Sequence, residues 1–487
     1  MSTMPKAIEE LTLDPQDWDA VERLGHRMVS DMMAYLKEVR QRPVWQPVPP
    51  EVRQTFEDGP PMEPRPLEDI YQDFVHHILP YPAGNIHPRF WGWVIGNGTV
   101  SGVLAEMLAA AMNSNVFGGD QAPGFLENQV IGWFKQIYGY EESTSGLLVS
   151  GGSMANLLAL AVARNAMAGM DMNRDGIRAA APLTLYASVE AHSSIVKAVQ
   201  LLGLGGSALR SVAVNDRFEI DLHALEDRIQ EDLDSGRRPF CVIGNAGTVN
   251  TGATDNLREL SRIAKKYGTW FHVDGSFGSF AVLSPELRHL VDGIDQADSL
   301  TFCLHKWMYM QYEASCVLIR QREQHHKTFA HAGSYLSHTE GGFAGAGEWF
   351  NEYGMQLSRG FRALKVWFAI REHGLRTYGK LIQQNAEQAR YLGRRIESTP
   401  ELELLAPVPL NVVCFRYRFP VQNEAQLNQL NERLLIEVQK SGVALPSFTR
   451  IHGKAALRVA VTNHRSRLED FDLFLDTVLH CGRHLAF

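Results

Sequence analysis

From about Gly84 onward, the sequence alternates between short β-rich runs and longer segments with helical periodicity, and this alternation limits the possible folds more than any other feature. Short apolar runs separated by helices are typical of a mainly parallel sheet that is covered on both faces. The sequence therefore predicts an α/β domain. The predicted strands are residues 146–150, 183–188, 240–245, 269–274, 299–304 and 315–320, and the predicted helices before and between them are residues 103–112, 126–138, 154–165, 194–202 and 256–267.

The length of the chain, 487 residues, predicts more than one structural unit. Single hydrophobic cores stop growing near roughly 250 to 300 residues. Residues 1–85 are predicted to be helical and then, in the Pro-rich stretch 43–66, extended; they have too little apolar surface to fold alone, so we expect them to pack on a partner subunit. Residues 86–370 form the predicted large α/β domain, and residues 371–487 a small C-terminal α+β domain.

The composition is that of an ordinary globular protein, with 45% hydrophobic and 21% charged residues. A net charge of −8 argues against a nucleic-acid-binding surface. No apolar run is long enough for a membrane span or a signal peptide, so we expect a cytoplasmic location. The five cysteines are widely spaced and lack a C-x-x-C pattern, and the pair His325-His326 lies in a polar stretch typical of a solvated surface. We predict neither disulfides nor a metal site.

Lys306 and Asp274 follow two of the predicted strands directly. Ligands in open α/β sheets collect at the carboxyl ends of strands. A lysine there can form a Schiff base with an aldehyde cofactor, and a carboxylate can keep the ring nitrogen of pyridoxal 5'-phosphate (PLP) protonated. A single lysine after a strand is usually only a solvated strand end, but the pair together indicates a PLP enzyme.

Other groups at predicted strand ends fit the remaining needs of this cofactor. The turn Ser150-Gly-Gly-Ser153 opens a helix, where glycines and free amides can approach a phosphate. His192 follows strand 183–188 and could stack on a planar ring, although a single histidine at such a position more often caps a helix or packs in the core. Thr248 follows another strand. Each signal is weak alone, and together they predict one PLP site.

The ordered set of motifs resembles the PLP-dependent group II decarboxylases, the family that includes aromatic L-amino-acid decarboxylase. The resemblance runs from about residue 24 to about residue 374 and more weakly to the C-terminus. It is carried by His87-Pro-Arg-Phe90, Ser150-Gly-Gly-Ser153, Glu190-Ala-His-Ser-Ser194, His272-Val-Asp274, His305-Lys-Trp307 and Phe361-Arg-Ala-Leu-Lys365.

The resemblance implies the type I fold of PLP-dependent transferases, with a mainly parallel seven-stranded sheet, and a homodimer with active sites at the subunit interface. It also implies roles for individual residues. Lys306 would carry the Schiff base, Asp274 would pair with the ring nitrogen, and His192 would stack on the ring. The phosphate would be held by Gly152, Ser153 and His305, with Thr248 and Ser276 near the ring.

The Gly-rich stretch 320–347 has the composition of a lid. In the family, a mobile loop in this region places a tyrosine over the cofactor, and Tyr335 matches it. Relatives with Phe at that position resemble aldehyde synthases. The phenol of Tyr335 therefore favours simple decarboxylation, with Tyr335 guiding protonation.

Three stretches of the sequence depart from the family pattern. The family usually has Asn-Pro before His-Lys, whereas this chain has Cys303-Leu304, so one donor to the phosphate is missing. Two stretches expected to line the substrate pocket also differ: Trp93 and Val94 replace aromatic residues, and the segment with Asn113 and Asn115 carries amides in place of apolar and aromatic residues. Buried amides reject an apolar ring, so an aromatic substrate is the default of the family, not a deduction.

We therefore expect decarboxylation of an L-amino acid, aromatic by family default, to the amine and CO2. Two alternatives stay open at this stage. One is another PLP reaction on the same scaffold, such as oxidative deamination to an aldehyde or transamination. The other is a non-catalytic family member, suggested by Cys303 and the altered pocket.

Overall fold

The computed structural model describes residues 10–331, 339–421 and 423–486, which form two compact units. The first contains the described residues up to Arg42 together with Pro47–Pro82. The second contains Pro43–Gln46 and everything described from Ala83 onward. No described helix has the length and apolar character needed to cross a bilayer.

The first unit is a small helical segment. Its helices are α1 (Trp18–Lys37), α2 (Pro50–Gln54) and α3 (Leu67–Asp73). The prediction that 43–66 is extended was wrong where Pro50 starts α2, because proline is well suited to the first turn of a helix. Few side chains here are buried, and Trp18, Phe56 and Met62 are exposed, which fits a segment that cannot form its own core.

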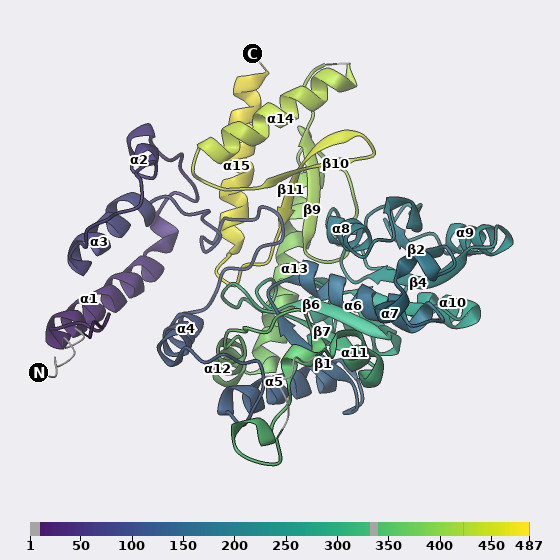
Figure 1. Ribbon diagram of the computed structural model, residues 1–487. Coiled ribbons are helices and arrows are strands. Elements are labelled where there is room, and N and C mark those ends of the chain that lie inside the picture. The colour runs from purple at the N-terminus through teal and green to yellow at the C-terminus, as the bar shows by residue number, and fades with distance from the viewer. Residues whose placement is uncertain (1–9, 332–338, 422, 487) are drawn as a thin grey trace, which may run out of the picture. The chain divides into compact units, whose positions relative to one another are not determined.

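The second unit contains the predicted sheet of seven strands, in the order β1-β7-β6-β5-β4-β2-β3 (Figure 1). The strands from β3 to β6 run parallel, and β7 is antiparallel to both β6 and β1, so the prediction of a mainly parallel sheet is confirmed. The strands are β1 (Ser145–Val149), β2 (Leu183–Ser188), β3 (Leu209–Val212), β4 (Arg238–Asn245), β5 (Trp270–Asp274), β6 (Ser299–Cys303) and β7 (Ser315–Ile319).

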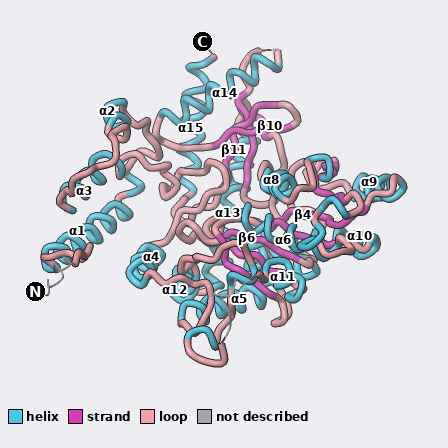
Figure 2. The backbone as a smooth tube through the Cα atoms, in the orientation of Figure 1, coloured by secondary structure: helices cyan, strands magenta, loops and turns pink. Residues whose placement is uncertain are grey.

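Every residue of β2, β5, β6 and β7 is buried, so both faces of the sheet are covered. Figure 2 shows the strands enclosed by helices. The helices of this part of the chain are α4 (Val100–Met112), α5 (Ala122–Tyr138), α6 (Gly152–Met167), α7 (Met172–Asp175), α8 (Ser193–Leu201), α9 (Leu222–Asp234), α10 (Leu257–Tyr267), α11 (Arg322–Phe329) and α12 (Ala363–His373). Helix α11 occupies part of the predicted lid segment.

The prediction that His325 and His326 are both solvated was wrong for His325, which lies in α11. Its side chain is fully buried and bonded between the Ser145 hydroxyl, 2.8 Å from Nδ1, and the Tyr353 carbonyl, 2.8 Å from Nε2. The local sequence is polar, but α11 packs on α6, so one face of this short helix enters the core. His326 is half-buried and lies 2.9 Å from Glu352.

The C-terminal part of the chain forms a second, antiparallel sheet in the order β10-β11-β9-β8 (Figure 1). Its elements are α13 (Leu375–Glu397), β8 (Leu402–Leu404), β9 (Val412–Tyr417), α14 (Glu424–Lys440), β10 (Ser447–Ile451), β11 (Lys454–Ala460) and α15 (Leu468–Leu485). This sheet has its own apolar core, and α13 contributes Ile382 to the first core and Leu392 to the second. A domain boundary near residue 371 stays a prediction, because α13 joins the two cores.

Candidate active site

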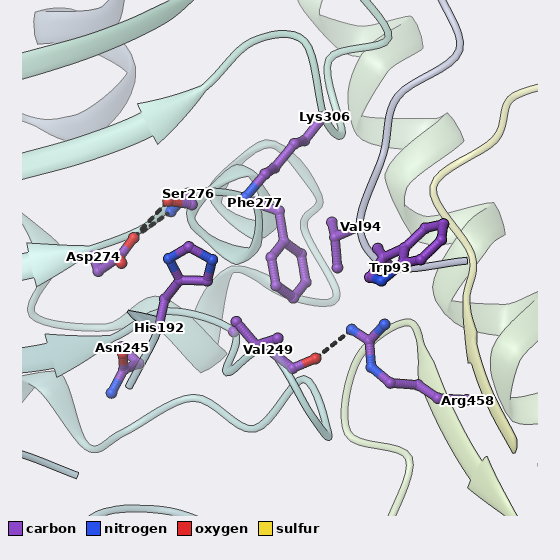
Figure 3. Close-up of a pocket in the computed structure, with 11 residues that line it drawn as sticks. Trp93, Val94, His192, Asn245, Val249, Asp274, Ser276, Phe277, Lys306 and Arg458 are labelled. Carbon is purple, nitrogen blue, oxygen red and sulfur yellow. Dashed lines mark hydrogen bonds between the residues drawn. The ribbon is translucent and has the colours of Figure 1, made fainter. Parts of the chain in front are cut away.

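A cavity of about 220 Å³ lies at the carboxyl ends of β4 and β5 (Figure 3). Four of the residues predicted to bind the cofactor line it: His192, Asp274, Ser276 and Lys306. They come from separate segments of the chain, and the parallel strands bring them together because the strands end at one edge of the sheet. Trp93 and Val94, which were predicted to line the substrate pocket, also line it, and the remaining lining residues are Asn245, Gly247, Val249, Phe277 and Arg458.

Asp274 ends β5, and its buried carboxylate accepts three hydrogen bonds. Ser276 donates to Oδ1 through its hydroxyl at 2.6 Å and through its backbone N–H at 3.1 Å, and Asn156 donates to Oδ2 at 2.8 Å. Burial alone would raise the pKa of Asp274. The hydrogen bonds from Ser276 and Asn156, with the positive charge of Lys306, outweigh burial and lower this pKa below its ordinary value. The side chain is therefore an anion poised to hold a protonated nitrogen.

Lys306 lies in the turn after β6, where its backbone N–H bonds to the Cys303 carbonyl at 3.2 Å. Its side chain extends into the cavity toward Ser276 and His192 (Figure 3). Gly96 packs against this turn so closely that a Cβ at residue 96 would lie 1.8 Å from the His305 carbonyl oxygen. This contact lets the segment with Trp93 and Val94 pass beside the lysine.

His192 does two things that the sequence left as alternatives. It is the N-cap of α8, where Nδ1 accepts a hydrogen bond from the Ser194 N–H at 3.1 Å, and it also lines the cavity. Because Nδ1 is an acceptor, the neutral ring carries its proton on Nε2. Burial lowers the pKa of His192, which favours this neutral form.

The residues that were predicted to hold the phosphate lie around the start of α6. This helix has no side-chain N-cap, so its first amides are free to bind an anion. Gly152 packs tightly: a Cβ there would lie 2.9 Å from both Cys303 Sγ and Ser276 Oγ. Ser153 is exposed at the same terminus. We call this start of α6 the phosphate cradle. It adjoins the cavity, because Ser276 lies beside Gly152 and also lines the cavity.

His305 is held by the backbone of the chain segment that leads into β7. Its Nδ1 accepts a hydrogen bond from the Ala314 N–H at 3.3 Å, and its ring lies 4.5 Å from the Tyr312 ring centroid. Burial, with the nearby charge of Lys306, lowers the pKa of His305 to about 3. The ring is therefore neutral and has an Nε2–H available as a donor. Cys303 is fully buried against Gly152 and takes the place of the amide that the resemblance led us to expect.

Three other predicted residues lie outside the cavity. The Thr248 hydroxyl lies 3.1 Å from the Thr251 hydroxyl and is buried, although its neighbours Gly247 and Val249 line the cavity. Asn113 lines a second cavity of about 330 Å³, and Asn115 accepts a hydrogen bond from the Arg359 N–H at 2.9 Å. Neither amide contributes to the polarity of the first cavity. Tyr335 lies outside the described residues.

Arg458 lines the cavity and was not predicted. It lies in β11 and is only 3% exposed. Its guanidinium donates to the carbonyls of Val249 and Asn250 and to Ser447, and no carboxylate pairs with it among the described residues. Burial lowers its pKa. A buried cation without a counter-charge would have been hard to find from the sequence, since nothing around residue 458 marks it.

The chain is similar to known proteins over most of its length. The model of the pyridoxal-dependent decarboxylase conserved domain matches residues 49–418. The chain belongs to this family. It is a PLP-dependent amino-acid decarboxylase, and the anionic Asp274, the lysine, the neutral histidine and the uncapped helix fit that cofactor. The predictions of family, cofactor and enzyme class are confirmed. Among the described residues there is no cluster of three metal-binding side chains.

Relatives of this decarboxylase include enzymes with different products. An aromatic-L-amino-acid decarboxylase of Bacillus atrophaeus is 31% identical over 95% of each chain. A phenylacetaldehyde synthase of Petunia hybrida is 27% identical over 92% of this chain and 91% of its own. The crystal structure of Oryza sativa TDC with PLP and tryptamine superposes with a TM-score of 0.90 at 22% identity, covering 98% of this chain and all of the other, which supports the fold.

Proposed function

We propose that this decarboxylase converts an aromatic L-amino acid to the corresponding amine and CO2. The observation that carries the proposal is the juxtaposition of Lys306, Asp274 and His192 in one cavity whose remaining walls are largely apolar. Bound PLP supplies an electron sink for the bond that breaks at the substrate α-carbon. The described residues supply attachment, orientation and charge.

Each polar group has one proposed task. Lys306 would attach the cofactor through its amine, Asp274 would hold the protonated ring nitrogen, and His192 would cover one face of the ring. The phosphate would be held by Gly152, Ser153 and His305, with Ser276 at the cavity and Thr248 outside its lining, between Gly247 and Val249. Tyr335 delivers the proton that replaces CO2, as the resemblance implies.

The lining of the cavity supports an aromatic side chain on the substrate. Trp93, Val94, Val249 and Phe277 present apolar surface, and the amides of Asn113 and Asn115 lie elsewhere in this chain. An apolar wall accepts a ring without leaving polar groups unpaired. The guanidinium of Arg458 is the available cation for the carboxylate of the substrate.

We further propose a cytoplasmic homodimer with active sites at the subunit interface. Helix α4 exposes Val100, Met107, Leu108 and Met112, each between 43% and 53% exposed, an apolar face that a second copy would cover. A native mass of twice 54.5 kDa in solution is expected, and a mass of 54.5 kDa would contradict the dimer.

Oxidative deamination to an aldehyde is the second candidate. It is favoured by the similarity to a protein named phenylacetaldehyde synthase, whereas the tyrosine at position 335 favours the amine. The two reactions differ in their reactants and products, because only the oxidative route consumes O2 and water and releases ammonia and peroxide together with the aldehyde and CO2.

The test is an absorbance spectrum of the purified protein between 300 and 500 nm, followed by a panel of amino acids with CO2, ammonia and peroxide measured in parallel. We expect a visible band and CO2 alone, with aromatic substrates preferred. Lys306→Ala should abolish both the band and turnover, with the exposed Lys327→Ala as the control. Turnover that survives in Lys306→Ala would contradict the proposal.

A further inference from the structure

Asn156, on the second turn of α6, is fully buried and uses all of its hydrogen-bonding capacity. Its Nδ2 donates to Asp274 Oδ2 at 2.8 Å and to Ser194 Oγ at 3.0 Å. Its Oδ1 accepts from Thr301 Oγ1 at 2.7 Å and lies 3.1 Å from His272 Nε2. An amide has two donors and two acceptor sites, so no capacity is left.

The direction of these hydrogen bonds follows from the anionic carboxylate. Asp274 only accepts, so the amide nitrogen of Asn156 must face it, and the amide oxygen must face Thr301 and His272. His272 therefore donates from Nε2. Its Nδ1, 2.8 Å from the Ser299 hydroxyl, must then accept, and Ser299 in turn accepts from Trp270 Nε1 at 2.8 Å.

The result is a chain of donors that runs from Trp270 through Ser299, His272 and Asn156 to the carboxylate of Asp274. All of these side chains are buried. Burial lowers the pKa of His272 to about 4, in agreement with the neutral ring that the geometry requires. Water cannot compete for the members of such a chain, so their orientations are coupled.

A second arm leads from Asn156 to the histidine in the cavity. Ser194 Oγ accepts from Asn156 and lies 2.8 Å from His192 Nδ1. The Ser194 oxygen accepts a hydrogen bond from the Asn156 amide, and the Ser194 O–H donates to His192 Nδ1, which carries no proton. This arrangement reinforces the backbone bond to the same nitrogen and holds the remaining proton of His192 on Nε2, at the cavity.

We propose that Asn156 is a positioning residue that orients the Asp274 carboxylate and the His192 imidazole together. The inference rests on the proposed function, because it takes these two groups to meet the ring nitrogen and the ring face of PLP. One amide would thereby orient the Asp274 carboxylate toward the ring nitrogen. The same amide would help to keep the proton of His192 on Nε2. Ser276 also bonds to this carboxylate and the Ser194 N–H also bonds to this imidazole, but among these groups Asn156 is the one whose hydrogen bonds lead to both.

The experiment compares Asn156→Ala and Asn156→Asp with wild type and with the control Asn165→Asp. Asn165 lies on the same helix, half-buried, and bonds only to Arg164 and Asn173. The measurements are PLP affinity by absorbance titration of the apoenzyme, the pH dependence of the visible band, kcat and KM, and the melting temperature of the apoenzyme.

We expect kcat and PLP affinity to fall about tenfold or more in Asn156→Ala, with a smaller change in KM, because an orienting group contributes to the reacting geometry. Asn156→Asp should be worse and should shift the pH dependence of the band, since two carboxylates would then face each other. The control should match wild type. A lower melting temperature with unchanged kcat, band and PLP affinity would mean that Asn156 only packs, and would overturn the inference.

Two further variants keep the test decisive. If Asn156 variants do not fold, Ser299→Ala removes the hydroxyl that donates to His272 and accepts from Trp270. This variant should lower kcat and PLP affinity in the same direction, by a smaller factor; wild-type values would overturn the inference.

Asp274→Ala separates the two proposals. Wild-type turnover in Asp274→Ala would defeat the proposed function, whereas a loss there with no effect at Asn156 would defeat this inference alone.

Discussion

Arg458 on β11 of the smaller sheet donates through Nη2 to the backbone carbonyl of Val249, in the loop after β4 of the larger sheet. Both residues line the cavity (Figure 3). The bond spans 209 positions in the sequence. It holds a buried cation in a cavity where Asp274 is the one carboxylate among the described lining residues, so the C-terminal part of the chain completes the pocket.

Replacing Arg458 with Met should lower kcat/KM for the amino-acid substrate by about 10- to 100-fold, mainly through KM, because a charge-assisted hydrogen bond to a carboxylate contributes roughly 1.5–3 kcal/mol. Steady-state kinetics measure this. The matched control is Arg450→Met on the neighbouring strand, whose guanidinium is exposed and pairs with Glu432 at 2.6 Å. Equal kinetics in the two variants would exclude Arg458 from substrate binding.

Gly152→Ala should weaken PLP binding by about tenfold or more. The new methyl group would meet Cys303 Sγ and Ser276 Oγ at 2.9 Å and would displace the start of α6, which forms the phosphate cradle. The affinity is measured by absorbance titration of the apoenzyme. In Gly151→Ala the methyl group meets no atom within 4 Å, so this neighbour separates crowding from a general effect of alanine in the turn. Unchanged affinity in Gly152→Ala would show that the cradle does not need this close packing.

The stability of the protein should fall at acidic pH, in part through His325. Burial lowers the pKa of His325 to about 3 in the folded protein, against an ordinary value of 6.5. Between these values the unfolded chain binds a proton that the folded one does not. The free energy of unfolding therefore decreases as the pH drops from 6.5 toward 3, by up to about 1.4 kcal/mol per pH unit for this residue.

Urea denaturation between pH 7 and pH 5 checks this dependence. His325→Gln should reduce the steepness of the fall, because glutamine does not titrate. The control is His326→Gln, which changes the half-buried neighbour on the same helix. Identical pH profiles for wild type and His325→Gln would contradict the prediction.

The large sheet and its carboxyl-end residues could be predicted because they depend on local patterns. Runs such as Leu183–Ser188 predict buried strands. Asp274 ends such a run, and Lys306 follows another. The elements that were missed have weaker local signals. Strand β3 has one buried residue in four, and β10 alternates buried and exposed positions at the edge of the small sheet.

The sequence by itself determined the type of fold, the family and the identity of the main polar groups, since periodicity and short motifs are encoded over a few neighbouring residues. Only the tertiary structure decided which atoms meet. Asn156 and Asp274 are 118 positions apart, and Arg458 comes from a different sheet. Asn113 and Asn115, in contrast, lie outside the cavity they were expected to line. The direction of a hydrogen bond and the burial of a charge are properties of packed neighbours, and no local pattern specifies them.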